Sequence, residues 1–110
     1  MSVTPITSRT QFKEIVNGSR PVVIHFWAAW SGPCRKIRPV LEELSEDPEN
    51  SGVVFYTVDV DKLEDIKEEV GVAVVPTFMA FQDGNKLGEL RGANPKGLKQ
   101  LVQQAVETGA

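Results

Sequence analysis

Two kinds of apolar run alternate along the chain. Residues 21–29 are nearly all apolar, as expected of a strand that is covered on both faces, and residues 53–60 indicate a second central strand. Around them, apolar residues recur at spacings of three and four, which is typical of one helix face. One such helix begins near Ser8, another follows residues 30–34, and a short one ends at Gly71. This alternation predicts α/β architecture.

Local signals predict where the helices begin, end and bend. Ser8 and Gln11 have the spacing of a capping box, in which Gln11 reaches back to the residue that caps the helix. Asn17-Gly18 is expected to end that helix. The next helix contains Pro39, which removes one backbone hydrogen bond and therefore predicts a kink. Residues 47–52 are expected to form a loop.

The C-terminal part of the chain predicts a hairpin and a final helix. Strands at 77–82 and 86–91 flank Asp83-Gly84-Asn85, a strong turn signal. Asn94-Pro95 supplies an N-cap followed by a proline at the first helical position. The predicted order is β-α-β-α-β-α-β-β-α, in one domain that covers residues 1–110.

Composition narrows the classes of function. The chain has 110 residues and a net charge of -3, so it lacks the basic surface that recruits nucleic acid or an anionic membrane. No apolar run approaches the length of a bilayer span, and the N-terminus does not resemble a signal peptide. One cysteine precludes an internal disulfide, so a cytoplasmic location is expected. No metal-ligand spacing or phosphate-binding loop is present, and we expect neither a metal nor a bound cofactor.

The segment WSGPC, residues 30–34, lies where a predicted strand passes into a helix. In open α/β sheets, chemistry is located at the carboxyl ends of the strands. A cysteine at position 31 would complete a Cys-x-x-Cys redox pair with Cys34, but this chain has Ser31 there. An engineered substitution and a natural loss of the cysteine are both compatible with the sequence.

Several motifs together resemble the thioredoxin family over essentially the whole chain. Residues 26–34, FWAAWSGPC, are similar to the family's FWAxWCGPC, and residues 75–78, VPTF, are similar to its cis-proline turn. Gly84 and Gly92 also stand where the family has glycines. The resemblance implies a thioredoxin fold, with a central mixed sheet flanked by helices on both faces. It also implies a protein-disulfide reductase, with a NADPH-dependent thioredoxin reductase as partner and no bound cofactor.

The resemblance assigns Ser31 to the position of the attacking cysteine and Cys34 to that of the resolving cysteine. A thiolate at the first position attacks a substrate disulfide, and the second thiol then resolves the mixed disulfide. A serine oxygen cannot form that intermediate, so the first step should be lost. Cys34 is then either a slow, single-turnover thiol or a small buried apolar residue.

His25 stands where the family has a buried aspartate that is thought to move protons for the second cysteine. A buried histidine stays neutral, because loss of solvation disfavours the cation. His25 is therefore either a substitute base for Cys34 or a core histidine hydrogen-bonded to the backbone. Asp59 and Asp61 either face partners or end a strand and open a turn, and the second interpretation is preferred.

The resemblance predicts a cis peptide bond before Pro76, with Val75 offering its backbone N–H and C=O to an extended substrate. The alternative is that Pro76 merely begins a strand. For Trp30, the alternative to substrate contact is a scattered surface aromatic residue. The predicted apolar docking patch consists of Trp30, Gly32, Pro33, Val75, Pro76, Gly92 and Ala93.

Two functional hypotheses follow. The chain is either a protein-disulfide reductase inactivated or crippled by Ser31, or a redox-inactive module that binds extended, cysteine-containing protein segments. Whether the chain is itself an enzyme stays open. A homodimer through Cys34 or through the apolar patch is compatible with both hypotheses.

Overall fold

A computed structural model describes residues 3–109. In this part of the chain the elements follow the predicted order, with one short 3-10 turn (η1) inside the predicted loop. Their bounds are β1 Val3–Pro5, α1 Arg9–Val16, β2 Val22–Trp27, α2 Gly32–Glu46, η1 Pro48–Asn50, β3 Val54–Asp59, α3 Glu64–Val70, β4 Thr77–Gln82, β5 Asn85–Arg91 and α4 Pro95–Gly109.

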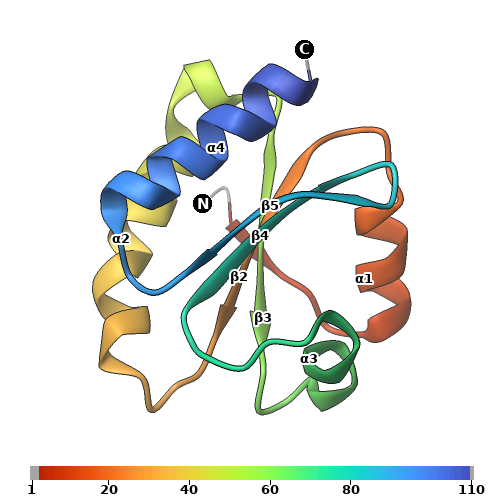
Figure 1. The fold of residues 1–110 in the computed structure, drawn as a ribbon, viewed down its shortest axis with the longest axis vertical. Helices are drawn as coiled ribbons and strands as arrows, with labels where there is room; N and C mark the ends of the chain where they lie inside the picture. Colours follow the sequence, from red (N-terminus) through yellow and green to blue (C-terminus); the bar gives the residue numbers. More distant parts are fainter. Residues whose placement is uncertain (1–2, 110) are drawn as a thin grey trace.

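The strands form one mixed sheet in the order β1-β3-β2-β4-β5. β2 runs parallel to β3 and antiparallel to β4, and β5 is antiparallel to β4. Helices α2 and α4 cover one face of the sheet, and α1 and α3 cover the other (Figure 1). The predicted central mixed sheet with helices on both faces is therefore confirmed.

Alternation along β2 divides the core into two layers. Ile24 and Phe26 pack in the layer that includes Phe12 of α1 and Ile66 of α3. Val23 belongs to the layer on the opposite face. Helices α2 and α4 contribute to that second layer Ile37, Leu41, Leu98, Leu101, Val102 and Ala105. Both faces of β2 are thus covered, which explains why its sequence is apolar except for His25.

The cap of α1 differs in one detail from the prediction. Ser8 is the N-cap, and its Oγ accepts a hydrogen bond from the Gln11 N–H at 3.1 Å. The Gln11 side chain, however, does not reach back to Ser8. Its Oε1 accepts from the Thr7 N–H at 2.7 Å and from the Thr7 hydroxyl at 3.1 Å. The Gln11 side-chain oxygen thus satisfies two donors of Thr7, whereas in a reciprocal capping box it would satisfy only the Ser8 N–H.

The β4–β5 hairpin is tighter than predicted. Gln82 pairs directly with Asn85, so β5 begins one residue earlier and the turn consists of Asp83 and Gly84. Both turn residues have positive φ, 53° and 80°, as a two-residue hairpin with the twist of the sheet requires. At the start of α4, Asn94 Oδ1 accepts from the Gly97 N–H at 3.1 Å, in agreement with the predicted cap. Helix α2 continues through Pro39.

Candidate active site

Ser31 lies just beyond β2, at the lower end of the sheet in Figure 1, and is the N-cap of α2. Its Oγ accepts a hydrogen bond from the Cys34 N–H at 3.3 Å. The Ser31 side chain is buried, and the residue is only 4% exposed. The hydroxyl turns inward and satisfies a backbone donor of the first helical turn.

Cys34 lies in the first turn of α2 and is 3% exposed, as expected of the inner position of the motif. A cavity of about 90 Å³ reaches it, which we call the Cys34 cavity. Its lining residues are His25, Trp27, Cys34, Arg35 and Arg38. His25 and Cys34, both predicted from the sequence as site residues, therefore line the same cavity.

His25 occupies the middle of β2 and is 1% exposed. Its ring stacks on Phe78, with 4.6 Å between ring centroids and 12° between planes. Within residues 3–109, neither ring nitrogen has a hydrogen-bond partner. The interpretation of His25 as a core histidine tied to the backbone is therefore wrong. Burial, together with the nearby Arg38 charge, lowers the pKa of His25 to about 3, so the imidazole is neutral at pH 7.

Arg35 and Arg38 were not among the predicted site residues. The Arg35 guanidinium donates to the Ala29 carbonyl at 2.8 Å, and Arg38 Nε donates to Glu42 at 3.3 Å. Both arginines also line the Cys34 cavity. A signal was present, because Arg38 follows Cys34 by four residues and so lies one turn along the same helix face.

The Val75–Pro76 peptide bond is cis, as predicted. Pairing of Thr77 with Phe26 places this bond at the end of the sheet where β2 leads into the motif. The Gly92 N–H donates to the Pro76 carbonyl at 2.8 Å, so two predicted site residues from separate segments lie together. Pro76 itself is buried and Val75 is half-buried.

The exposed apolar residue beside the cis bond is Val74, at 50% exposure, which the sequence reasoning missed. The Thr77 hydroxyl donates to the Val74 carbonyl at 2.6 Å and so fixes this turn. Gly32 is half-buried, and Pro33 and Ala93 are exposed.

Trp30 is 71% exposed, yet its orientation is fixed. The indole Nε1 donates to Asp61 Oδ2 at 3.0 Å. Asp59 ends β3 as predicted, and its side chain accepts from the Asp61 N–H at 3.0 Å. Asp61 therefore does more than open a turn, because it positions the aromatic ring that precedes the motif.

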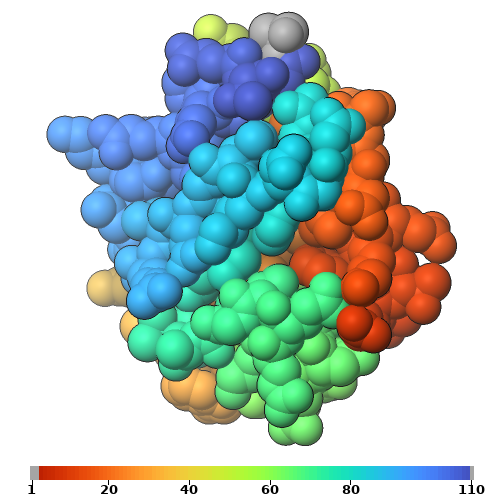
Figure 2. Space-filling model, turned by 45° about the vertical axis from the view of Figure 1, so that its right-hand side comes forward, coloured from red at the N-terminus to blue at the C-terminus, as the bar shows by residue number. Residues whose placement is uncertain are grey.

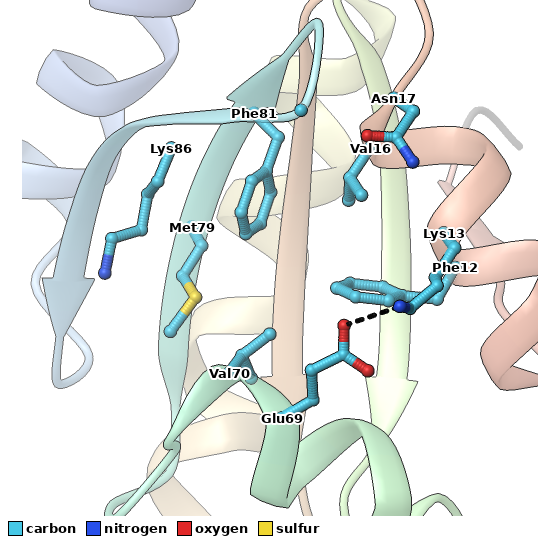
Figure 3. Close-up of a pocket in the computed structure, with 10 residues that line it drawn as sticks. Phe12, Lys13, Val16, Asn17, Glu69, Val70, Met79, Phe81 and Lys86 are labelled. Carbon is cyan, nitrogen blue, oxygen red and sulfur yellow. Dashed lines mark ion pairs between the residues drawn. The ribbon is translucent and has the colours of Figure 1, made fainter.

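A larger pocket of about 390 Å³ lies on the opposite side of the sheet, between α1, α3 and the β4–β5 hairpin (Figure 2). Phe12, Val16 and Met79 form part of its apolar wall, and Lys13 pairs with Glu69 at its rim at 3.7 Å (Figure 3). It contains none of the predicted site residues. Among residues 3–109, no group of three or more acidic, histidine or cysteine side chains is placed to hold a metal ion. In the same range, no helix has the length and apolarity needed to cross a bilayer.

Comparison with known proteins gives a consistent result. The family model described as Thioredoxin matches residues 3–104. The chain is 44% identical over 102 residues to a thioredoxin of Malassezia sympodialis, covering 93% of this chain and 97% of that protein. It is 41% identical over 106 residues to human thioredoxin, covering 94% and 99% respectively. The crystal structure of the Malassezia sympodialis thioredoxin superposes with a TM-score of 0.92, covering 96% of this chain and 91% of that one.

Proposed function

Because the chain belongs to the thioredoxin family, we propose that it has the scaffold of a protein-disulfide reductase in which Ser31 blocks the first step of exchange. Family membership is consistent with thiol–disulfide oxidoreductase chemistry. The substrates of that chemistry are protein disulfides. The finer proposal concerns what this chain's own residues can still do.

One observation carries the proposal: the only side chain at the attacking position is a buried hydroxyl that caps α2. Thiol–disulfide exchange needs a thiolate that attacks a disulfide sulfur and forms a sulfur–sulfur bond. A serine hydroxyl stays protonated at neutral pH, and its oxygen cannot form the mixed disulfide. The reaction therefore stops before its first covalent intermediate.

Cys34 is the remaining thiol, and it lies beneath the surface. Small or well-placed disulfides would react with it slowly. Any mixed disulfide would persist, since the sequence holds no second cysteine to resolve it. We propose that the neutral imidazole of His25, which lines the same cavity without a hydrogen bond to Cys34, serves as a base for Cys34 in the role that the family gives to aspartate.

The partner and location follow from the same proposal. A Ser31→Cys protein would cycle with a NADPH-dependent thioredoxin reductase, which reduces the disulfide of a completed motif. A cytoplasmic location fits a chain with one cysteine and no internal disulfide. Burial of Cys34 argues against a homodimer linked through it and leaves the apolar patch as the surface for self-association.

A second function, binding without turnover, is favoured by the surface around the motif. Trp30 and Val74 are exposed apolar side chains, and the half-buried Val75 precedes the cis bond. The backbone of Val75 can pair with an extended segment as an added strand does. Such a module would hold cysteine-containing segments and release them unchanged.

Reduction of insulin by dithiothreitol separates the two functions. The chain itself and a Ser31→Ala control are expected to leave the uncatalysed rate unchanged, whereas Ser31→Cys is expected to give repeated turnover. Recovery of insulin reduction in Ser31→Cys would support a reductase scaffold in which the serine oxygen blocks the reaction. An inert Ser31→Cys protein would favour the binding module and would implicate His25. Repeated turnover by the chain as written would contradict both.

A further inference from the structure

The Cys34 cavity is lined by a thiol, an imidazole and two arginines, and Ser31 is not part of its lining. Its volume of about 90 Å³ is well above the roughly 10–15 Å³ that one water molecule needs. It is far below the roughly 300 Å³ at which pockets begin to hold drug-sized ligands. A molecule of a few atoms therefore fits beside the sulfur without unfolding of the protein.

The polar groups of this cavity match a small molecule that both donates and accepts hydrogen bonds. His25 is 1% exposed, and neither nitrogen of its ring has a partner within residues 3–109. A neutral imidazole presents one N–H donor and one acceptor nitrogen. A buried polar group without a partner is costly, so a small polar guest that satisfies both nitrogens would be stabilised here.

The charges around the cavity favour an anionic product on the sulfur. Arg35 and Arg38 contribute to its lining, and the described residues of that lining include no acidic side chain, although Glu42 pairs with Arg38 at 3.3 Å. Cys34 also lies in the first turn of the 15-residue helix α2, where the helix dipole favours negative charge. A sulfenate oxygen formed on Cys34 would share this cavity with the two arginines.

From this geometry we propose that Cys34 is a hydrogen peroxide-reactive site, with the Cys34 cavity admitting the peroxide and His25 positioning it. The thiolate sulfur attacks one peroxide oxygen, so that a sulfur–oxygen bond forms and the oxygen–oxygen bond breaks. The departing hydroxide takes up the proton lost by the thiol and leaves as water. In sum, the thiol and hydrogen peroxide give a sulfenic acid and water, with sulfur oxidised by two electrons and the peroxide reduced.

The sulfenic acid is expected to persist in the folded protein. A sulfenic acid ordinarily condenses with a nearby thiol to a disulfide, but Cys34 is the only cysteine in the sequence. A larger thiol such as glutathione does not fit the cavity. Oxidised Cys34 therefore accumulates with exposure to peroxide, and the protein does not reduce peroxide repeatedly. This inference goes beyond the proposed function and needs no disulfide substrate.

The test compares hydrogen peroxide with tert-butyl hydroperoxide on the full chain. Oxidation at Cys34 is followed by peptide mass spectrometry after unfolding in dimedone, which traps sulfenic acid. Each rate is divided by the rate for free N-acetylcysteine with the same oxidant. Cys34→Ser corrects for oxidation at methionine. The normalised rate with hydrogen peroxide is expected to exceed that with tert-butyl hydroperoxide by about tenfold or more, the discrimination that one or two misplaced contacts produce.

His25→Phe preserves an aromatic ring against Phe78 and removes both nitrogens. Its normalised rate with hydrogen peroxide is expected to fall about tenfold, as when one hydrogen bond to a reacting group is lost. Arg20→Gln, an exposed change at a residue that donates to the Ser51 carbonyl, should leave the rate unchanged. Equal normalised rates for the two hydroperoxides would overturn the proposal, as would modification that occurs only after unfolding. Since these measurements use the unmodified chain, they decide the matter even if His25→Phe fails to fold.

Discussion

At the scale of single residues, Ser31 satisfies a backbone donor at the position that we propose for the attacking cysteine. Serine is among the best N-cap residues because its oxygen accepts from a free N–H of the first helical turn. Here that donor is the N–H of Cys34. The hydroxyl at the position proposed for the attacking cysteine therefore stabilises the helix on which Cys34 lies.

His25 predicts a pH dependence of stability. Its folded-state pKa of about 3 is below the ordinary value of 6.5, because burial disfavours the imidazolium and the Arg38 charge adds to this effect. Between these two pH values the unfolded chain binds a proton that the folded chain does not. The free energy of unfolding should therefore fall as pH decreases from about 6.5, by up to about 1.4 kcal/mol per pH unit. Urea unfolding at a series of pH values from neutral to about 4 measures this slope.

His25→Phe is the matched variant, because it cannot take up that proton. Its free energy of unfolding should depend less on pH over the same range. Hydrogen bonds from Arg9 to Glu69 and from Lys86 to Glu89 lower the pKa of those carboxylates, and both stabilising contributions fade as pH falls. They act equally in both proteins and cancel in the difference. If the free energy of unfolding depended on pH equally in the two proteins, folding would not lower the pKa of His25, and this prediction would be wrong.

At the scale of elements, the β4–β5 hairpin joins two parts of the candidate site. β4 follows Pro76 directly, and β5 leads to Gly92. The Gly92 N–H donates a hydrogen bond to the Pro76 carbonyl. The turn that sets the register of this pair depends on positive φ at Asp83 and Gly84. Weakening the turn should therefore destabilise the cis-proline edge as well as the tip of the hairpin.

Gly84→Ala tests that dependence. A side chain at φ 80° costs about 1–2 kcal/mol, and the new methyl would lie 2.7 Å from the Asn17 side-chain oxygen unless Asn17 rotates. We expect the free energy of unfolding to fall by about that amount in urea titrations. Gly52→Ala is the control, because its φ is not positive and nothing lies within 4 Å of the added carbon. A Gly84→Ala protein as stable as the Gly52→Ala control would refute this account of the turn.

At the scale of the whole molecule, Cys34 reports on global unfolding. It is 3% exposed and the Cys34 cavity is too narrow for a bulky reagent. If labelling by Ellman's reagent requires global opening, the native rate should be slower than the denatured rate by about a thousandfold or more, for a stability of ~5 kcal/mol. Absorbance of the released thiolate, with and without urea, gives both rates. Fast labelling of the native protein would mean that the sulfur is reached without unfolding.

Much of this architecture was predictable from the sequence, because periodicity and turn residues act locally. The run 21–29 predicted a doubly covered strand, and Asp83-Gly84 predicted a hairpin. Features that depend on distant contacts were not predictable. The orientation of Trp30 depends on Asp61, and the isolation of the His25 nitrogens depends on which side chains pack around β2. The Cys34 cavity likewise combines residues of β2 and α2 that no local pattern links.

The hydrogen bond between Trp30 and Asp61 makes the indole a built-in optical probe. An aromatic ring that faces solvent emits at long wavelength, and a client covering it would shift the emission toward the blue. Trp27 is half-buried, and a Trp27→Phe variant would isolate the Trp30 signal. Occupancy of this surface can therefore be followed by fluorescence without any added dye.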